Sequence, residues 1–144
     1  MNALRHIVLL LLLAPYAVAQ PVVPASIESV VSGGYWETPE NHGRYRVLVV
    51  NEGFEHVISK VYVQWVAEAT SPATSPAVVA TKQIQPLFSG APVSLTAEIT
   101  PQGNNRAQIT LHGVNSVTQE PVSTSITVGA PGQVTVAAPN QRLC

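Results

Sequence analysis

The sequence predicts an all-β protein, folded as an antiparallel β-sandwich of about seven or eight strands. Apolar and polar residues alternate with a period of two along most of residues 26–137, and no segment there keeps a helical period. Clusters of Gly, Pro, Asn and Ser interrupt the alternation about every eight to twelve residues, which is the spacing of turns in a sandwich. Charged residues make up only 10% of the chain, as is typical of exported β proteins whose polarity comes from Ser, Thr, Asn and Gln.

Four strands are predicted in the first half of the chain, each alternating β-branched or aromatic side chains with polar ones. They occupy residues 26–32, 44–51, 57–69 and 78–85. The second strand carries Tyr45, Val47 and Val49 on one face, and the third carries Val63 and Trp65. Trp65 fits the place of the large aromatic residue that packs between the sheets of immunoglobulin-like domains, so the sandwich is expected to be immunoglobulin-like.

Four more strands are predicted in the second half, at residues 93–100, 107–112, 122–128 and 133–137. In the first of them Val93, Leu95 and Ile99 alternate with Ser, Thr and Glu, and in the next Ile109 and Leu111 alternate with Gln and Thr. The last two follow the same rule over shorter stretches. Each strand therefore turns one apolar face toward a shared core.

Short loops rich in turn residues connect these strands. Residues 52–56 join the second and third strands as a hairpin, and residues 101–105 form another tight connection. The small repeat at residues 71–77 contains two prolines, which predicts an exposed loop because proline cannot join a central strand. If Asn51 pairs with Val57 across the hairpin loop, Arg46 lies opposite Tyr62, Leu48 opposite Lys60, Arg44 opposite Gln64 and Val50 opposite Ile58.

The N-terminus predicts export from the cytosol. A weakly basic start precedes an apolar run at residues 7–14, and Ala17-Val18-Ala19 offers the small-x-small pattern that a signal peptidase cuts. The run is too short to span a bilayer, so no membrane anchor is expected. The predicted organisation is a signal peptide at residues 1–19, a flexible segment at 20–25, the β-sandwich domain at 26–137 and a C-terminal tail at 138–144.

The composition indicates in which compartment the protein acts and which kinds of partner it is expected to bind. The processed chain keeps six Lys and Arg against eight Glu and has no Asp, which gives no electrostatic reason to expect nucleic acid as a partner. Cys144 is the only cysteine, so a monomer is expected, with an intermolecular bridge through Cys144 as the alternative. The absence of an internal disulfide and of any Asn-x-Ser/Thr sequon favours a bacterial periplasm.

No arrangement of residues predicts catalysis or a bound cofactor. A hydrolytic triad would need Glu in place of Asp, no Ser sits in a nucleophile elbow, and nothing pairs the scattered Glu residues for glycoside chemistry. The histidines of the processed chain, His42, His56 and His112, lack a spacing that would fix a shared metal on a strand face. The sequence therefore predicts neither an enzyme, nor a cofactor, nor a metal site.

Two surfaces are candidates for binding. The outward face of the hairpin at residues 44–51 and 57–69 interleaves cations with apolar residues, which suits an acidic or amide-rich extended chain. Its candidate partner-binding residues are Arg44, Arg46, Lys60 and Tyr62. The equal alternative is that a loop covers this face, or that its cations keep the sheet from self-association.

The second candidate is Gly33-Gly34-Tyr35-Trp36, where Tyr35 and Trp36 beside flexible glycines could stack on sugars or peptides. The interpretation we favour for this segment is a strand start or bulge whose rings cover the open end of the sandwich.

A strand at residues 60–63 is followed by a run at 91–101, which contains Val93-Ser94-Leu95-Thr96 and an Ile99-Thr100-Pro101 turn, and by a strand at 106–111. In order and spacing, residues 60–128 resemble the small periplasmic curli-assembly proteins of the CsgC/AgfC type. The resemblance implies an immunoglobulin-like fold and a role in keeping the subunits of an amyloid surface fibre from polymerising early. The best-known members carry a Cys-x-Cys pair that this chain lacks, so no redox role is implied.

The chain also resembles the first domain of pilus chaperones, in two strand segments, Val63-Gln64-Trp65-Val66 and Ile84-Gln85-Pro86-Leu87. Those chaperones have two domains, whereas this chain has room for one. The first expectation is thus a non-enzymatic periplasmic protein that assists or restrains assembly of a secreted fibre, with the fibre subunit as its protein partner. Two other classes stay open: a ligand- or glycan-binding module that uses Tyr35 and Trp36, and a structural subunit of a surface appendage.

Overall fold

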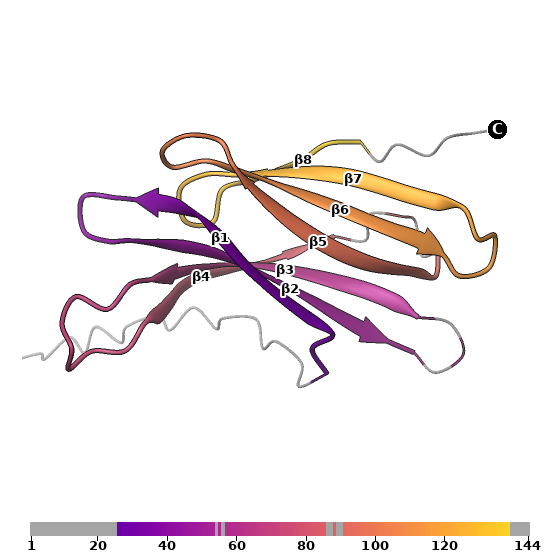
Figure 1. The fold of residues 1–144 in the computed structure, drawn as a ribbon, viewed down its shortest axis with the longest axis horizontal. Coiled ribbons are helices and arrows are strands. Elements are labelled where there is room, and N and C mark those ends of the chain that lie inside the picture. Colours follow the sequence, from indigo (N-terminus) through magenta and orange to yellow (C-terminus); the bar gives the residue numbers. More distant parts are fainter. Residues whose placement is uncertain (1–25, 54, 56, 86–87, 89–90, 139–144) are drawn as a thin grey trace, which may run out of the picture.

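The computed structural model describes residues 26–53, 55, 57–85, 88 and 91–138, and its regular structure is entirely β (Figure 1). The strands are β1 (Ser29–Glu37), β2 (His42–Glu52), β3 (Ile58–Ala67), β4 (Ala77–Ile84), β5 (Val93–Pro101), β6 (Ala107–Asn115), β7 (Pro121–Val128) and β8 (Val134–Val136). The predicted fold class and strand number are confirmed. The predicted signal peptide at residues 1–19, the segment 20–25 and tail residues 139–144 lie outside the described residues. Within the described ranges, no helix is long and apolar enough to cross a membrane.

The strands form two antiparallel sheets that face each other as layers (Figure 1). The first sheet has the order β1-β2-β3-β4 and the second the order β5-β6-β7-β8, so each is a run of consecutive strands. The chain passes between the sheets once, from β4 to β5. Immunoglobulin domains instead alternate between their sheets through Greek-key connections. The predicted two-layer sandwich is therefore confirmed. Its connectivity, however, is that of two successive meanders and not that of an immunoglobulin domain.

The core lies between the two sheets and consists mainly of the residues that the alternation places on their inner faces, with Trp36 added by a bulge in β1. The first sheet contributes Trp36, Tyr45, Val47, Val49, Val61, Val63 and Trp65. The second sheet contributes Val93, Leu95, Ala107, Ile109, Leu111, Val122, Ile126 and Val128. Full burial of one Val, Leu or Ile side chain contributes about 1.5–3 kcal/mol, so burial supplies most of the free energy that holds the layers together.

Two aromatic side chains of the first sheet reach the same backbone carbonyl in the second. Trp65 Nε1 donates a hydrogen bond of 2.8 Å to the carbonyl oxygen of Gly129, and Tyr45 Oη donates one of 3.1 Å to the same atom. The two rings meet edge to face, with centroids 6.2 Å apart and an interplanar angle of 76°. Gly129 follows β7 and opens the turn to β8. These bonds tie the two sheets together, as the inter-sheet disulfide does in antibody domains.

The buried Tyr45 hydroxyl makes stability depend on alkaline pH. Burial raises the pKa of Tyr45 from 10.0 to about 12, because the phenolate would lose its hydration in the core. The neutral form therefore stabilises the fold fully below pH 10, and this contribution is lost as the pH rises through 12. We expect the unfolding free energy to fall by about 2 kcal/mol between pH 10 and 12 from this group. Denaturant titrations of wild type and Tyr45→Phe check it, since an equally steep fall in the variant would contradict this assignment.

A bulge in β1 brings Trp36 into the core. The register with β2 shifts between Gly33 and Trp36, and Gly34 has a φ of 66°. A Cβ on Gly34 would lie 2.8 Å from Cδ2 of Tyr45, so this position needs glycine for both backbone conformation and space. The segment therefore forms the bulge that the favoured interpretation of the sequence expected.

The hairpin of β2 and β3 has a register that differs from the prediction. Glu52 pairs with Ile58, and Asn51 pairs with Ser59, whose Oγ donates a 2.7 Å hydrogen bond to Asn51 Oδ1. The loop begins at Gly53, whose φ of 101° only glycine adopts readily. The predicted pairing of Arg46 with Tyr62, and with it the other predicted pairs, is wrong by two residues. A shift of two residues leaves every side chain on its predicted face.

Candidate functional site

The predicted docking residues share the outer face, by which we mean the face of the first sheet turned away from the second sheet. Arg44 and Arg46 project from β2 between the buried core residues of that strand, and Lys60 and Tyr62 belong to β3. The observed pairs across the two strands are Arg44 with Val66, Arg46 with Gln64, Leu48 with Tyr62, and Val50 with Lys60. The structure therefore brings these residues to one face, but not into the rows that the sequence predicted.

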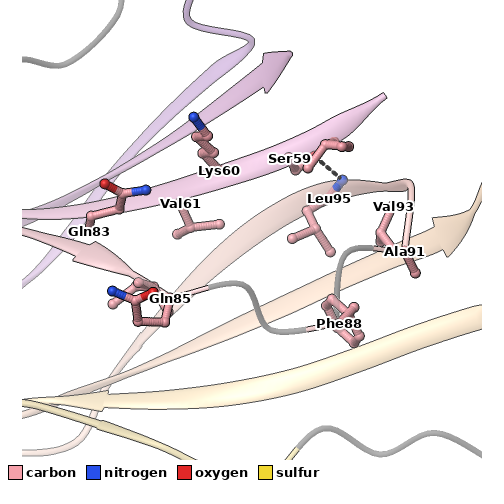
Figure 2. Close-up of a pocket in the computed structure, with 11 residues that line it drawn as sticks. Ser59, Lys60, Val61, Gln83, Gln85, Phe88, Ala91, Val93 and Leu95 are labelled. Atoms are coloured by element: carbon pink, nitrogen blue, oxygen red, sulfur yellow. Dashed lines mark hydrogen bonds between the residues drawn. The ribbon is translucent and has the colours of Figure 1, made fainter. Parts of the chain in front are cut away.

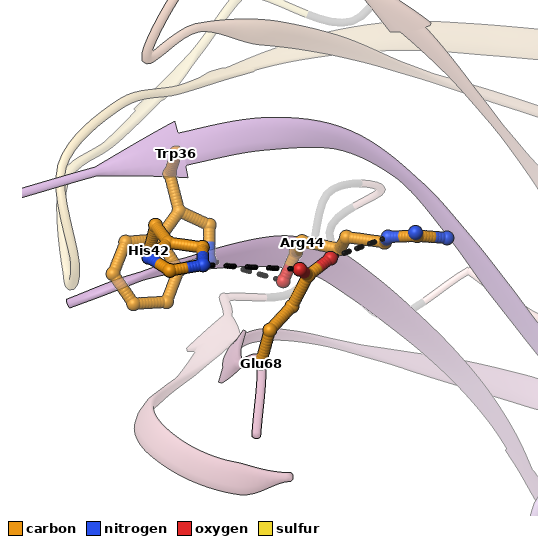
Figure 3. Close-up of polar contacts among 4 residues, drawn as sticks. All are labelled: Trp36, His42, Arg44 and Glu68. Atoms are coloured by element: carbon orange, nitrogen blue, oxygen red, sulfur yellow. Dashed lines mark hydrogen bonds and ion pairs between the residues drawn. The ribbon is translucent and has the colours of Figure 1, made fainter. Parts of the chain in front are cut away.

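Two of the three predicted cations have acidic partners. Lys60 Nζ lies 2.7 Å from Glu52 Oε2, and this hydrogen bond raises the pKa of Lys60. Arg44 Nε lies 3.0 Å from Glu68 Oε1, and His42 Nε2 lies 3.9 Å from the other carboxylate oxygen (Figure 3). Solvent screens these exposed pairs, so they add little to stability. They do compensate most of the positive charge that the sequence predicts for this face.

Arg46 is the exception and is held in place by an amide. Its Nε donates a 2.9 Å hydrogen bond to Gln64 Oε1, and Gln64 Nε2 donates a 3.3 Å bond to Thr81 Oγ1. Gln64 is only 6% exposed, so its buried amide holds the Arg46 side chain in place. The two hydrogen bonds form a row that crosses β2, β3 and β4. In the part of the chain that the structure describes, no carboxylate lies within ion-pair distance of Arg46. Among the described residues no acceptor bonds its two terminal nitrogens, which could therefore bind an anion.

A hollow of about 350 Å³ adjoins this side chain; we call it the Arg46 hollow. It draws residues from β1, β2 and β3 and from the loop before β4, among them Ser32, Arg44, Arg46, Val66, Glu68 and Pro76. Most of the surface that lines it is apolar, and it carries one compensated and one uncompensated guanidinium. That combination suits a ligand with a single negative charge and an apolar neighbour.

Tyr62 is not available as a docking residue, which corrects the prediction. Its side chain is only 4% exposed and forms a small apolar cluster with Leu48 and Val50, separate from the core between the sheets. In the observed register Tyr62 lies opposite the apolar Leu48 and not opposite Arg46. The ring therefore supports the outer face instead of contacting a partner.

Tyr35 and Trp36 do not form a ligand platform. Trp36 is fully buried, and its Nε1 donates a 3.1 Å hydrogen bond to the carbonyl oxygen of Arg44 (Figure 3). Tyr35 is 39% exposed and its ring lies 6.2 Å from that of His42. The bulge at Gly34 sends the two rings to different environments, so the predicted stacking surface of two aromatic residues is wrong.

A second hollow, of about 100 Å³, lies between β3, the end of β4 and the start of β5 (Figure 2). Its walls include Val61, Phe88, Val93 and Leu95, and Ser59 Oγ accepts a 3.0 Å hydrogen bond from the backbone nitrogen of Leu95 across the gap. Ligand pockets usually have volumes of about 300–1,000 Å³. This hollow is therefore a packing gap at the end of the sandwich, and not a candidate site.

The residues that decide the charge of the outer face were not predicted from the sequence as site residues. Glu52, Glu68 and Gln64 share the period-two face of Lys60 and Arg46, so the alternation already placed them beside the cations. Only the correct register shows which acid meets which base, and it leaves Arg46 with the amide of Gln64.

Metal ligands do not gather in the described ranges, where no three His, Cys, Asp or Glu side chains converge. His56 and Cys144 lie outside these ranges. No family model, curated protein or solved structure matches this chain.

Proposed function

We propose that this protein is a non-enzymatic periplasmic accessory protein that restrains assembly of a secreted, curli-like surface fibre. In this proposal, the outer face of the first sheet binds extended segments of the fibre subunit. The observation that carries it is Arg46, an oriented guanidinium on a rigid sheet with no acidic partner among the described residues. The resemblance of residues 60–128 to curli-assembly proteins, and the export signal predicted at residues 1–19, support the same role.

The physical basis is the chemistry of unfolded fibre subunits. Amyloid subunits expose extended, amide-rich strands that template one another. A folded sandwich that holds such a segment on a polar, partly cationic surface competes with that templating. Nuclei are rare compared with monomers, so a weak and transient contact that acts on the nucleating species is enough to delay polymerisation at a low ratio of this protein to subunit.

Charge reversal on the outer face should weaken this delay. We expect the wild-type protein, at substoichiometric amounts, to lengthen the lag time of a purified curli major subunit measured by thioflavin fluorescence. The triple variant Arg44→Glu, Arg46→Glu, Lys60→Glu should lose the effect, and Arg46→Glu alone should lose most of it. The reason is that Glu68 and Glu52 already compensate the other two cations.

Arg106→Glu is the matched control, because Arg106 is exposed in the turn before β6, away from the outer face. Circular dichroism of each variant checks that the fold is kept. Unchanged lag times with the triple variant would remove the outer face from the proposal, and no delay by the wild-type protein would remove the function itself.

A further inference from the structure

We propose that the Arg46 hollow is a subsite for one side-chain carboxylate of an extended polypeptide. Arg46 binds the carboxylate, and Val66 and Pro76 receive the apolar residue beside it. The inference names the chemical group that the outer face selects. It rests on the proposed function for the identity of the polypeptide, and on the geometry of the hollow for the chemistry.

The orientation of Arg46 is the first argument. Gln64 holds Nε from below, and Thr81 holds Gln64, so the guanidinium plane is fixed before any ligand arrives. No acceptor among the described residues occupies the terminal nitrogens, whose parallel N–H groups match the two oxygens of a carboxylate. A preoriented side chain loses little conformational freedom on binding, which raises the affinity of a single contact.

The charge count of the hollow is the second argument. Glu68 already compensates Arg44 at 3.0 Å, so the hollow carries one uncompensated positive charge, that of Arg46. One carboxylate completes the balance, whereas a second carboxylate would face Glu68. The hollow should therefore prefer an isolated acidic residue between apolar or amide residues over a run of acidic residues.

The shape and lining are the third argument. A volume of about 350 Å³ is near the lower end of ligand pockets, so it holds one side chain and part of the next. Val66, Ala69 and Pro76 give it apolar walls. A small free carboxylic acid would leave the apolar walls exposed to solvent. In a polypeptide, the residue next to the acidic one would bury them. The occupant is therefore a segment of protein chain.

The test is a titration of the exported protein with three short peptides, followed by NMR of the arginine Nε–H and glutamine amide groups. The first peptide is capped at both ends and has one central Glu between Val residues. The second has Gln in place of that Glu. The third is the Gln peptide with a free C-terminal carboxylate. We expect the Glu peptide to bind with a Kd on the order of 1 mM and to shift the Arg46 and Gln64 signals. The Gln peptide should bind at least about tenfold more weakly.

Variants connect the preference to Arg46. Arg46→Gln should bind the Glu and Gln peptides equally, Arg46→Lys should recover only part of the preference, and Arg106→Gln should keep all of it. Equal binding of the Glu and Gln peptides by the wild-type protein would overturn the proposal. Tighter binding of the free C-terminal carboxylate than of the Glu side chain would overturn the assignment to a side chain.

The same variants separate this inference from the proposed function. A preference for Glu that depends on Arg46, without any delay of fibre formation, supports the subsite and overturns the function. A delay that persists in Arg46→Gln, without any preference for Glu, overturns the subsite and removes Arg46 from the proposed function, while the delay itself still supports a role in fibre assembly.

Discussion

Replacing Trp65 with alanine should lower the free energy of unfolding by about 3–5 kcal/mol, a large share of the stability of a domain of this size. Trp65 is fully buried between the sheets, its ring and that of Tyr45 meet edge to face, and its Nε1 donates a 2.8 Å hydrogen bond to the Gly129 carbonyl. The substitution leaves a cavity, removes the aromatic contact and removes one inter-sheet hydrogen bond. Urea denaturation followed by far-ultraviolet circular dichroism measures the loss.

Two milder substitutions separate packing from hydrogen bonding. Tyr45→Phe removes one donor to the Gly129 carbonyl while the other donor remains, so it should lower the free energy of unfolding by about 1 kcal/mol. Trp65→Phe removes the other donor and part of the buried ring, so its loss should be larger than that of Tyr45→Phe and smaller than that of Trp65→Ala. The double variant leaves that carbonyl without either side-chain donor, so its loss should exceed the sum of the two single losses. Strict additivity, or a loss in Trp65→Ala no larger than in Trp65→Phe, would contradict the role assigned to this contact.

The alternation of residues predicted the core because burial depends on which face a side chain occupies. Tyr45, Val63 and Trp65 are buried where the pattern placed them. The same pattern cannot fix the pairing of β2 with β3, since a slip of two residues preserves both faces. The loop decides that register, through the positive φ of Gly53 and the bond between Ser59 and Asn51. Nor does the alternation say which strands share a sheet, so the two meanders could not be predicted.

The alternation predicted the cations of the candidate site but not the side chains that pair with them, because it does not fix the register. The net charge of a strand face depends on which acidic and basic side chains are neighbours, and the register decides which of them are neighbours. In the observed register Arg46 bonds the amide of Gln64, whereas Glu68 pairs with Arg44 and Glu52 pairs with Lys60. Trp36 escaped the pattern for a different reason, because one extra residue in a bulge reverses the alternation behind it.

Gly43→Ala should also destabilise the fold severely, by about 3 kcal/mol or more. Gly43 pairs with Ala67 at the start of β2, and a Cβ there would lie 1.9 Å from the carbonyl oxygen of Val66. It would also lie 2.9 Å from the Cα of Ala67, so the clash is with backbone atoms that cannot rotate away. Relief requires β2 and β3 to separate locally, which breaks ladder hydrogen bonds.

Gly103→Ala is the matched control. Gly103 has a φ of 78° but no atom within 4 Å of an added Cβ, so only backbone strain of about 1 kcal/mol is expected. A loss in Gly43→Ala no larger than in Gly103→Ala would show that the strands yield easily. Gly43 and Ala67 adjoin Arg44 and Glu68, so separating the strands also disturbs the ion pair at the rim of the Arg46 hollow. Gly43→Ala should thus weaken the preference for the Glu peptide in any molecules that remain folded, whereas Gly103→Ala should leave that preference unchanged.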